Sequence, residues 1–123
     1  MFEIIKKFQF EAGHQLIHHD GKCQNPHGHS YVLILALQSE ELVPSGSKKN
    51  MVIDFADISE VVTPMIKEYF DHKWLNDTLE TESPTSEYIT KWIFEYLQPK
   101  LPLLHSVSLQ ETESSKVIYR MTN

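Results

Sequence analysis

The sequence has little cysteine, no long apolar segment and no export signal. Cys23 is the only cysteine, so an internal disulfide is excluded and a free thiol in a reducing compartment is predicted. No apolar run approaches the roughly 20 residues of a membrane span. The start Met1-Phe2-Glu3-Ile4 lacks the basic-then-apolar pattern of a secretory signal. These absences predict a cytoplasmic protein that does not associate with membranes.

Positive charge is also scarce. The 11 Lys and Arg residues are outnumbered by 17 Asp and Glu residues, which gives a formal net charge of −6. This charge, and the lack of any Lys and Arg cluster, argue against a nucleic-acid partner. An anionic small substrate would require a local basic pocket. The candidates for it, by closeness to the polar motifs of the chain, are Lys22, Lys73, Lys116 and Arg120.

Short segments rich in aromatic and branched residues predict β-strands. Two long strands are predicted over residues 2–12 and 30–39, and two shorter ones around 107–109 and 117–119. Residues 51–53 form a short apolar run that predicts a strand or a strand end. The chain shows no internal repeat, and 123 residues suit one domain over 1–123.

Two helices are predicted between the two pairs of strands. Apolar residues recur at helical spacing over 56–70, with Asp54 as a candidate N-cap. The segment 83–87 supplies a cap residue, a proline at the first helical position and an acid in the first turn of a helix that ends before Pro99. Residues 71–82 are predicted to be a polar loop. The fold class is therefore α+β: a four-stranded antiparallel sheet (ββααββ) with two helices on one face.

The motif His27-Gly28-His29 is the most informative feature of the chain. Alternate residues of an extended strand project to the same face, so the two imidazoles lie together. If the two N-terminal strands pair antiparallel, His14 lies across from them. Three imidazoles without a fourth protein ligand are typical of catalytic zinc, which keeps one position open for water or substrate. An alternative is a structural zinc site that Cys23 closes as the fourth ligand.

Two further polar groups lie at the ends of predicted elements, where functional residues often occur. Asp71-His72 follows the first helix, and Glu111 lies near the end of a strand. A carboxylate that accepts a hydrogen bond from an imidazole fixes its tautomer and makes a usable general acid or base. His72 finds this carboxylate either in its neighbour Asp71 or elsewhere. The structural alternatives are a helix C-cap for Asp71-His72 and a solvated strand end for Glu111.

The order and spacing of these motifs resemble the family of 6-pyruvoyltetrahydropterin and 6-carboxytetrahydropterin synthases. The matching segments extend over almost the whole chain: Phe10-Glu11-Ala12-Gly13-His14, Cys23 through His29, Val52-Ile53-Asp54-Phe55, Asp71-His72-Lys73-Trp74-Leu75-Asn76, Pro84-Thr85-Ser86-Glu87 and Glu111-Thr112. The spacing Cys-x-x-x-His-Gly-His is similar to the bacterial, queuosine-pathway branch. The resemblance implies the tunnelling fold, in which open sheets join around a trimer into a barrel, two trimers stack into a hexamer, and active sites lie between subunits.

The resemblance also implies a reaction. A zinc-dependent carbon–carbon lyase of this branch converts 7,8-dihydroneopterin triphosphate to 6-carboxy-5,6,7,8-tetrahydropterin, acetaldehyde and triphosphate in 7-deazaguanine and queuosine biosynthesis. By matching positions, the implied roles are zinc ligands for His14, His27 and His29, catalytic base for Cys23, proton relay for Asp71 and His72, and pterin anchor for Glu111.

The sequence leaves three competing functions open. The first is 6-pyruvoyltetrahydropterin synthase activity, which eliminates triphosphate from the same substrate but keeps the carbon chain. The second is a zinc hydrolase, in which water at the open metal position is the nucleophile. The third is a non-catalytic protein with a structural Cys-His₃ zinc site. Acetaldehyde release separates the two synthases, and the reactivity of Cys23 separates an enzyme from the structural protein.

Overall fold

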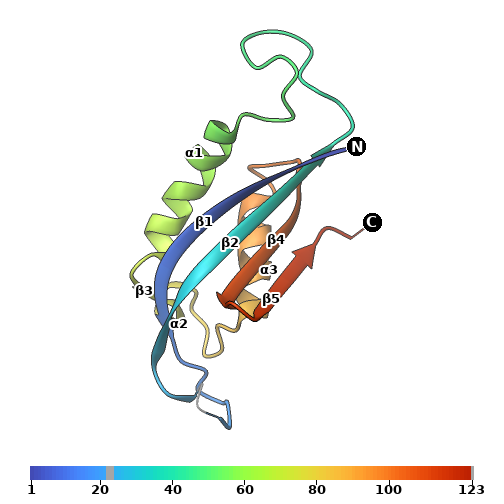
Figure 1. The fold of residues 1–123 in the computed structure, drawn as a ribbon. Helices are drawn as coiled ribbons and strands as arrows, with labels where there is room; N and C mark the ends of the chain where they lie inside the picture. Colours follow the sequence, from blue (N-terminus) through green and yellow to red (C-terminus); the bar gives the residue numbers. More distant parts are fainter. Residues whose placement is uncertain (22–23, 123) are drawn as a thin grey trace.

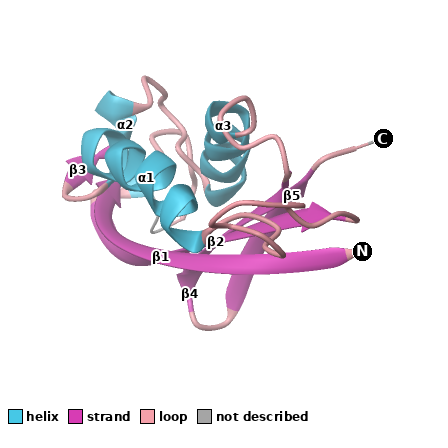
Figure 2. Ribbon diagram, turned by 90° about the horizontal axis from the view of Figure 1, so that it is seen from above, coloured by secondary structure: helices cyan, strands magenta, loops and turns pink. Residues whose placement is uncertain are grey.

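A computed structural model describes residues 1–21 and 24–122. All of its helices lie on one face of a single open sheet, as Figures 1 and 2 show from two directions. The strand order is β3-β1-β2-β4-β5. The strands are β1 (Phe2–His14), β2 (His27–Ser39), β3 (Lys73–Trp74), β4 (Leu104–Thr112) and β5 (Ser115–Arg120). The predicted α+β class, with helices on one face of the sheet, is confirmed.

The long ribbon of β1 and β2 extends further than the sequence predicted. The two strands pair antiparallel from Phe2 opposite Ser39 to His14 opposite His27. Both strands run past the predicted ends at residues 12 and 30, and all three histidines of interest therefore lie within the sheet. Side chains alternate between its faces, and Phe10, Ala12 and His14 are buried in succession on the face that the helices cover.

The helical segments are α1 (Phe55–Met65), a π-helical segment η2 (Ile66–Phe70), α2 (Leu75–Thr78) and α3 (Ser86–Leu97). The predicted cap of α1 is confirmed, since the Asp54 side chain accepts a hydrogen bond from the Ala56 N–H at 2.9 Å. The predicted helix over 56–70 is right in extent, but it changes to π-helical geometry after Met65. This change directly follows Pro64, which lacks an N–H group for the helical ladder.

The start of α3 differs from the prediction in detail. Its N-cap is Thr85, whose side chain accepts a hydrogen bond from the Tyr88 N–H at 3.1 Å. Pro84 therefore lies before the cap and not in the first turn. The helix ends at Leu97, before Pro99, as predicted. Its buried residues are Ile89, Thr90, Ile93, Phe94 and Leu97.

Two predicted segments were wrong. Residues 51–53 form no strand; the loop there turns back on itself, with the Val43 N–H donating to the Met51 carbonyl at 2.9 Å. Residues 71–82 are not only a loop, because they contain β3 and α2. Strand β3 pairs parallel with β1 at Ala12 and Gly13 and makes the sheet five-stranded instead of four-stranded. Both elements are too short to produce a hydrophobic period.

The core lies between the sheet and the helices and fixes the helical layer over β1, β2 and β4. Its fully buried larger side chains include Tyr31, Leu33, Leu35, Ile58, Phe70, Leu75, Ile93 and Leu104. None of the helices in the described part of the chain has the length and apolarity needed to cross a membrane. At the end of the sheet where β1 finishes and β2 begins, this apolar layer gives way to the histidine cluster.

Candidate metal centre and active site

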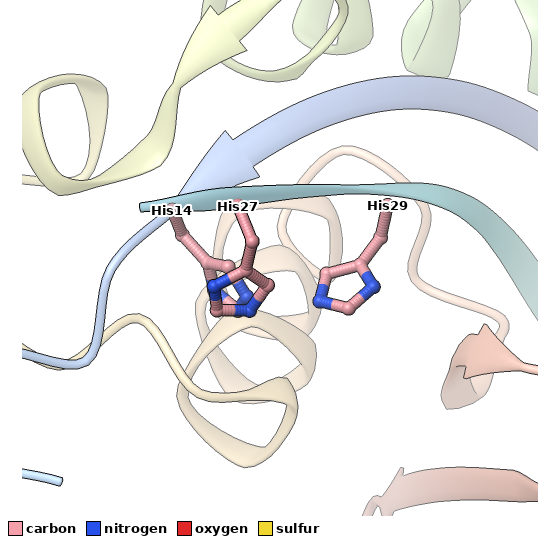
Figure 3. A group of neighbouring side chains, drawn as sticks. All are labelled: His14, His27 and His29. Carbon is pink, nitrogen blue, oxygen red and sulfur yellow. The ribbon is translucent and has the colours of Figure 1, made fainter. Parts of the chain in front are cut away.

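Three histidines converge at the end of the β1–β2 ribbon. His14 is the last residue of β1 and lies directly opposite His27, the first residue of β2, while His29 follows two positions later on the same face. Their candidate ligand nitrogens all lie within 4.8 Å of one another. Figure 3 shows the three imidazoles on the same side of the two strands, turned toward one another. The predicted same-face arrangement is present.

The hydrogen bonds of two of these rings leave the nitrogen that faces the cluster free. His14 Nδ1 lies 2.8 Å from the Pro84 carbonyl, and His27 Nδ1 lies 2.7 Å from the Asn25 carbonyl. A carbonyl only accepts, so each Nδ1 is protonated and each Nε2 keeps its lone pair. Such carbonyl contacts to the outer nitrogen are typical of metal-bound histidines, because they fix tautomer and orientation.

The unpaired nitrogens test whether a metal fits this cluster. His14 Nε2 is buried and has no hydrogen-bond partner among the described residues, and His29 Nε2 is buried with only a Glu111 carboxylate oxygen near it, at 3.3 Å. Buried polar atoms without partners are rare, and each requires an explanation. A divalent cation between three imidazole nitrogens supplies one, so the residues present fit a metal such as zinc.

Burial favours the neutral form of His14 and His29, which metal ligation requires. It lowers the pKa of His14, and the opposing effect of the bond to the Pro84 carbonyl is smaller. Burial likewise lowers the pKa of His29, against the opposing charge of Glu111. Neutral imidazole is the form that donates a lone pair to a metal.

Of the two paired glycines at this end of the sheet, Gly13 is the one at which close packing matters. A Cβ on Gly13 would lie 3.1 Å from the Trp74 ring, tighter than ordinary contact. At Gly28 the nearest atom is the Ala12 carbonyl oxygen at 3.4 Å, an ordinary contact. Gly13 therefore lets Trp74 lie flat against the end of β1, and this contact holds the short strand β3 at the sheet edge.

Glu111 lies beside the histidine cluster and is not a solvated strand end. One carboxylate oxygen accepts a hydrogen bond from Ser86 Oγ, and the other lies 3.3 Å from His29 Nε2. Ser86 is the first residue of α3, so the helix start and the end of β4 meet here. In the sequence, Ser86 stood out only as part of a helix-start motif, and nothing local pointed to this contact.

Asp71 and His72 form a pair at the other side of β1. Asp71 Oδ1 accepts a hydrogen bond from the Glu11 N–H at 3.0 Å, and Asp71 Oδ2 lies 3.0 Å from His72 Nδ1. His72 therefore finds its carboxylate in its own neighbour. This is sterically feasible because His72 has a φ of 59°, in the left-handed region that ordinary residues seldom adopt. The bond from the Glu11 N–H, and then that from His72, lower the pKa of Asp71.

The structure does not join all the predicted site residues. Within residues 1–21 and 24–122, no hydrogen bond or ion pair links Asp71 or His72 to the three histidines. The predicted catalytic base, Cys23, lies outside the described residues. A single chain thus presents two groups: the histidine cluster with Glu111, and the Asp71-His72 pair.

Comparison with known proteins identifies the family. A family model described as 6-pyruvoyl tetrahydropterin synthase matches residues 3–122. The chain belongs to this family. It is 46% identical over 120 residues to a protein of Synechocystis sp. named 6-carboxy-5,6,7,8-tetrahydropterin synthase, a match that covers 97% of this chain and 93% of that protein. A protein of Haemophilus influenzae with the same name is 38% identical, covering 98% and 99% of the two chains.

The fold agrees with this assignment to the 6-pyruvoyl tetrahydropterin synthase family. The structure of Caenorhabditis elegans 6-pyruvoyl tetrahydropterin synthase superposes with a TM-score of 0.85 at 26% identity and covers 98% of this chain and 96% of that one. As a member of the family the chain is an enzyme, a pterin synthase that acts on a small pterin substrate.

Proposed function

We propose that this chain is a single-domain, zinc-dependent carbon–carbon lyase of the cytoplasm. It converts 7,8-dihydroneopterin triphosphate to 6-carboxy-5,6,7,8-tetrahydropterin, acetaldehyde and triphosphate, a step toward 7-deazaguanines such as queuosine. The observation that carries the proposal is the cluster of His14, His27 and His29 with Glu111 at its rim. The names of the two curated relatives support the carboxy branch of the family.

The histidine cluster and Glu111 have different proposed roles: the histidines bind the metal, and Glu111 binds the substrate. His14, His27 and His29 would hold zinc through their inward nitrogens, and zinc bound there supplies Lewis-acid stabilisation of substrate oxygens. Glu111 would hold the pterin ring, because a carboxylate accepts two hydrogen bonds from the amino and ring N–H edge. Ser86 already occupies one of its oxygens and fixes the orientation of the carboxylate toward the cluster.

Cys23, Asp71 and His72 would move the protons. The Cys23 thiolate removes a proton from a substrate carbon, and His72 returns a proton to the ring. The Asp71 carboxylate lies 3.0 Å from His72 Nδ1 and would orient the imidazole for this transfer. The Glu11 N–H holds the other Asp71 oxygen, so the carboxylate itself is fixed to the sheet.

We further propose that the enzyme is a trimer or hexamer with active sites between subunits. The described sheet is open, with β3 at one edge and β5 at the other. Edge strands carry unpaired backbone groups, and closure of several sheets around a symmetry axis pairs them. Assembly would also bring the Asp71-His72 pair of one subunit to the histidine cluster of another. Light scattering at micromolar concentration tests this proposal, and a clean monomer would contradict it.

Product analysis tests the reaction. The purified zinc-loaded protein is incubated with dihydroneopterin triphosphate, and the products are identified by mass. The expected products are 6-carboxytetrahydropterin, acetaldehyde and triphosphate.

The second candidate function is 6-pyruvoyltetrahydropterin synthase, which the name of the matching family model favours. Triphosphate release without acetaldehyde would assign that activity, and an unchanged substrate would contradict both.

The variant Cys23→Ala separates the synthase from a zinc hydrolase and from a structural zinc protein. If the thiolate is the base, zinc content and melting temperature stay unchanged, while turnover falls by about 10²–10⁴-fold. If Cys23 instead closes a structural zinc site, zinc binding and thermal stability fall together. A zinc hydrolase retains its turnover, because its nucleophile is water. Turnover near that of the wild type would therefore remove Cys23 from the proposed mechanism.

A further inference from the structure

An open cavity of about 530 Å³ lies at the junction of β1, β2 and β3. Its lining includes the directly paired glycines Gly13 and Gly28, where the strands present backbone without side chains. His29, one of the three clustered histidines, and His72, of the Asp71-His72 pair, also line it. The strand pairing places Glu11, Gly13, Gly28 and Ser30 on the sheet face opposite the three imidazoles, so the cavity adjoins His72 and meets the histidine cluster only at His29. It has room for a portion of a substrate that is held beside His72.

Lys73 supplies the positive charge of this cavity. Among the described residues it is the only Lys or Arg in the cavity lining. Lys116 and Arg120, two other candidates for a basic pocket, line a different cavity over β4 and β5. Lys22, the remaining candidate, lies outside the described residues. Of the described candidates, only Lys73 therefore lies in the cavity that His72 lines, because Lys116 and Arg120 line the other one.

The ammonium group of Lys73 is also free of internal partners. In the described part of the chain, Lys48 pairs with Asp57 at 2.5 Å and Lys91 lies 3.9 Å from Glu95, but no carboxylate lies within 4.0 Å of the Lys73 ammonium. The acidic residue of the cavity, Glu11, accepts a hydrogen bond from Ser30 Oγ at 2.7 Å. An exposed lysine without an internal partner can bind an anion without first breaking an ion pair.

The overall charge of the chain makes such a cation necessary. At a net charge of −6 the protein repels a multiply charged anion unless a local cation offsets the repulsion. We propose that Lys73 binds the polyphosphate tail of the substrate and is a specificity-determining residue that favours the triphosphate over the unphosphorylated pterin. This inference rests on the proposed function, since it assigns the tail of the same substrate to the cavity beside His72.

Binding measurements on the full-length, zinc-loaded protein test the inference. Dissociation constants are measured in a Cys23→Ala background, which should keep zinc but not turn the substrate over, for dihydroneopterin triphosphate, unphosphorylated dihydroneopterin and inorganic triphosphate. Lys73→Gln should weaken both triphosphates by about tenfold or more, the loss expected for one charge-assisted contact. It should leave the unphosphorylated pterin unchanged. The difference from wild type should shrink as salt rises, because salt screens an exposed charge.

Two matched variants control for general effects. Lys116→Gln makes the same charge change in the other cavity and should move none of the three constants. Lys73→Arg keeps the charge and should retain most of the triphosphate affinity. Unchanged triphosphate binding in Lys73→Gln, or an equal loss for the unphosphorylated pterin, would overturn the inference. If inorganic triphosphate binds in a Lys73-dependent way while no pterin binds, the proposed function fails and the anion site stands.

Discussion

Two histidines in this protein illustrate opposite uses of the same side chain. His14 is 1% exposed, donates from Nδ1 to the Pro84 carbonyl, and directs a bare Nε2 into a cluster of imidazoles. The His72 side chain is 79% exposed, and its one ion-pair partner in the described chain is Asp71. Burial favours the neutral imidazole in the first case, while in the second the ring stays exposed beside a neighbouring carboxylate.

The difference indicates which parts of the site are preformed in one chain. The histidine cluster is held by three elements, since β1 and β2 carry the rings and the segment before α3 supplies the Pro84 carbonyl. The Asp71-His72 pair is oriented by its own carboxylate but is open to solvent. The first arrangement suits the proposed metal site, and the second suits the proposed proton-transfer group that would reach another subunit.

The largest expected effect is the loss of metal from the buried cluster. His27→Ala should remove nearly all bound zinc and with it turnover, because the two remaining imidazoles do not make a three-ligand site. The fold should persist, since His27 lies at the strand end and outside the hydrophobic core. Metal analysis and circular dichroism measure the two effects. His18→Ala, an exposed histidine paired with Glu82 at 2.6 Å, is the control; zinc retained in His27→Ala would contradict the site.

The exposed pair should give the next largest effect, without loss of metal. His72→Asn removes the proton carrier, and asparagine tolerates the left-handed backbone at this position. Turnover should fall by about 10²–10⁴-fold, as for the loss of a general acid or base. Zinc content should equal that of the wild type. A parallel loss of zinc would show that His72 also affects metal binding. The proposed division between the histidine cluster and the Asp71-His72 pair would then be wrong.

Glu111, the proposed pterin anchor beside the cluster, should give an intermediate effect. Glu111→Gln replaces a carboxylate oxygen by an amide donor that faces the donors of the pterin ring. Binding of a pterin product should weaken by about 2–4 kcal/mol, with zinc content little changed. Titration calorimetry on zinc-loaded protein measures this. An unchanged dissociation constant would remove Glu111 from the pterin site.

The smallest expected effect is on the pH dependence of stability. The bond from the Glu11 N–H lowers the folded-state pKa of Asp71, so ionised Asp71 stabilises the fold above the unfolded carboxyl pKa. That contribution is lost as the pH falls through the lower folded pKa. Asp71→Asn should therefore melt slightly below wild type at pH 7 and match it in strong acid. Equal differences in melting temperature at both pH values would contradict the assigned bond.

Much of the framework was predictable from local patterns. Richness in aromatic and branched residues predicted most of β1 and β2, and the i, i+2 spacing of His27 and His29 placed their rings on one face. The N-cap Asp54 and the end of α3 before Pro99 followed from their residue types. In contrast, β3 and α2 were missed, because two and four residues are too few to show a period.

The sequence by itself determined which residue types lie at the strand ends and that the imidazoles of His27 and His29 share a face, while the pairing that adds His14 came from the structure. Only the tertiary structure decided which nitrogen each ring directs inward, because that depends on carbonyls such as Pro84, which is 70 residues from His14. It alone placed Ser86 against Glu111 and brought Lys73 into one cavity with Gly13 and Gly28. These contacts join residues far apart in the chain, and they depend on how sheet and helices pack, which local periodicity does not encode.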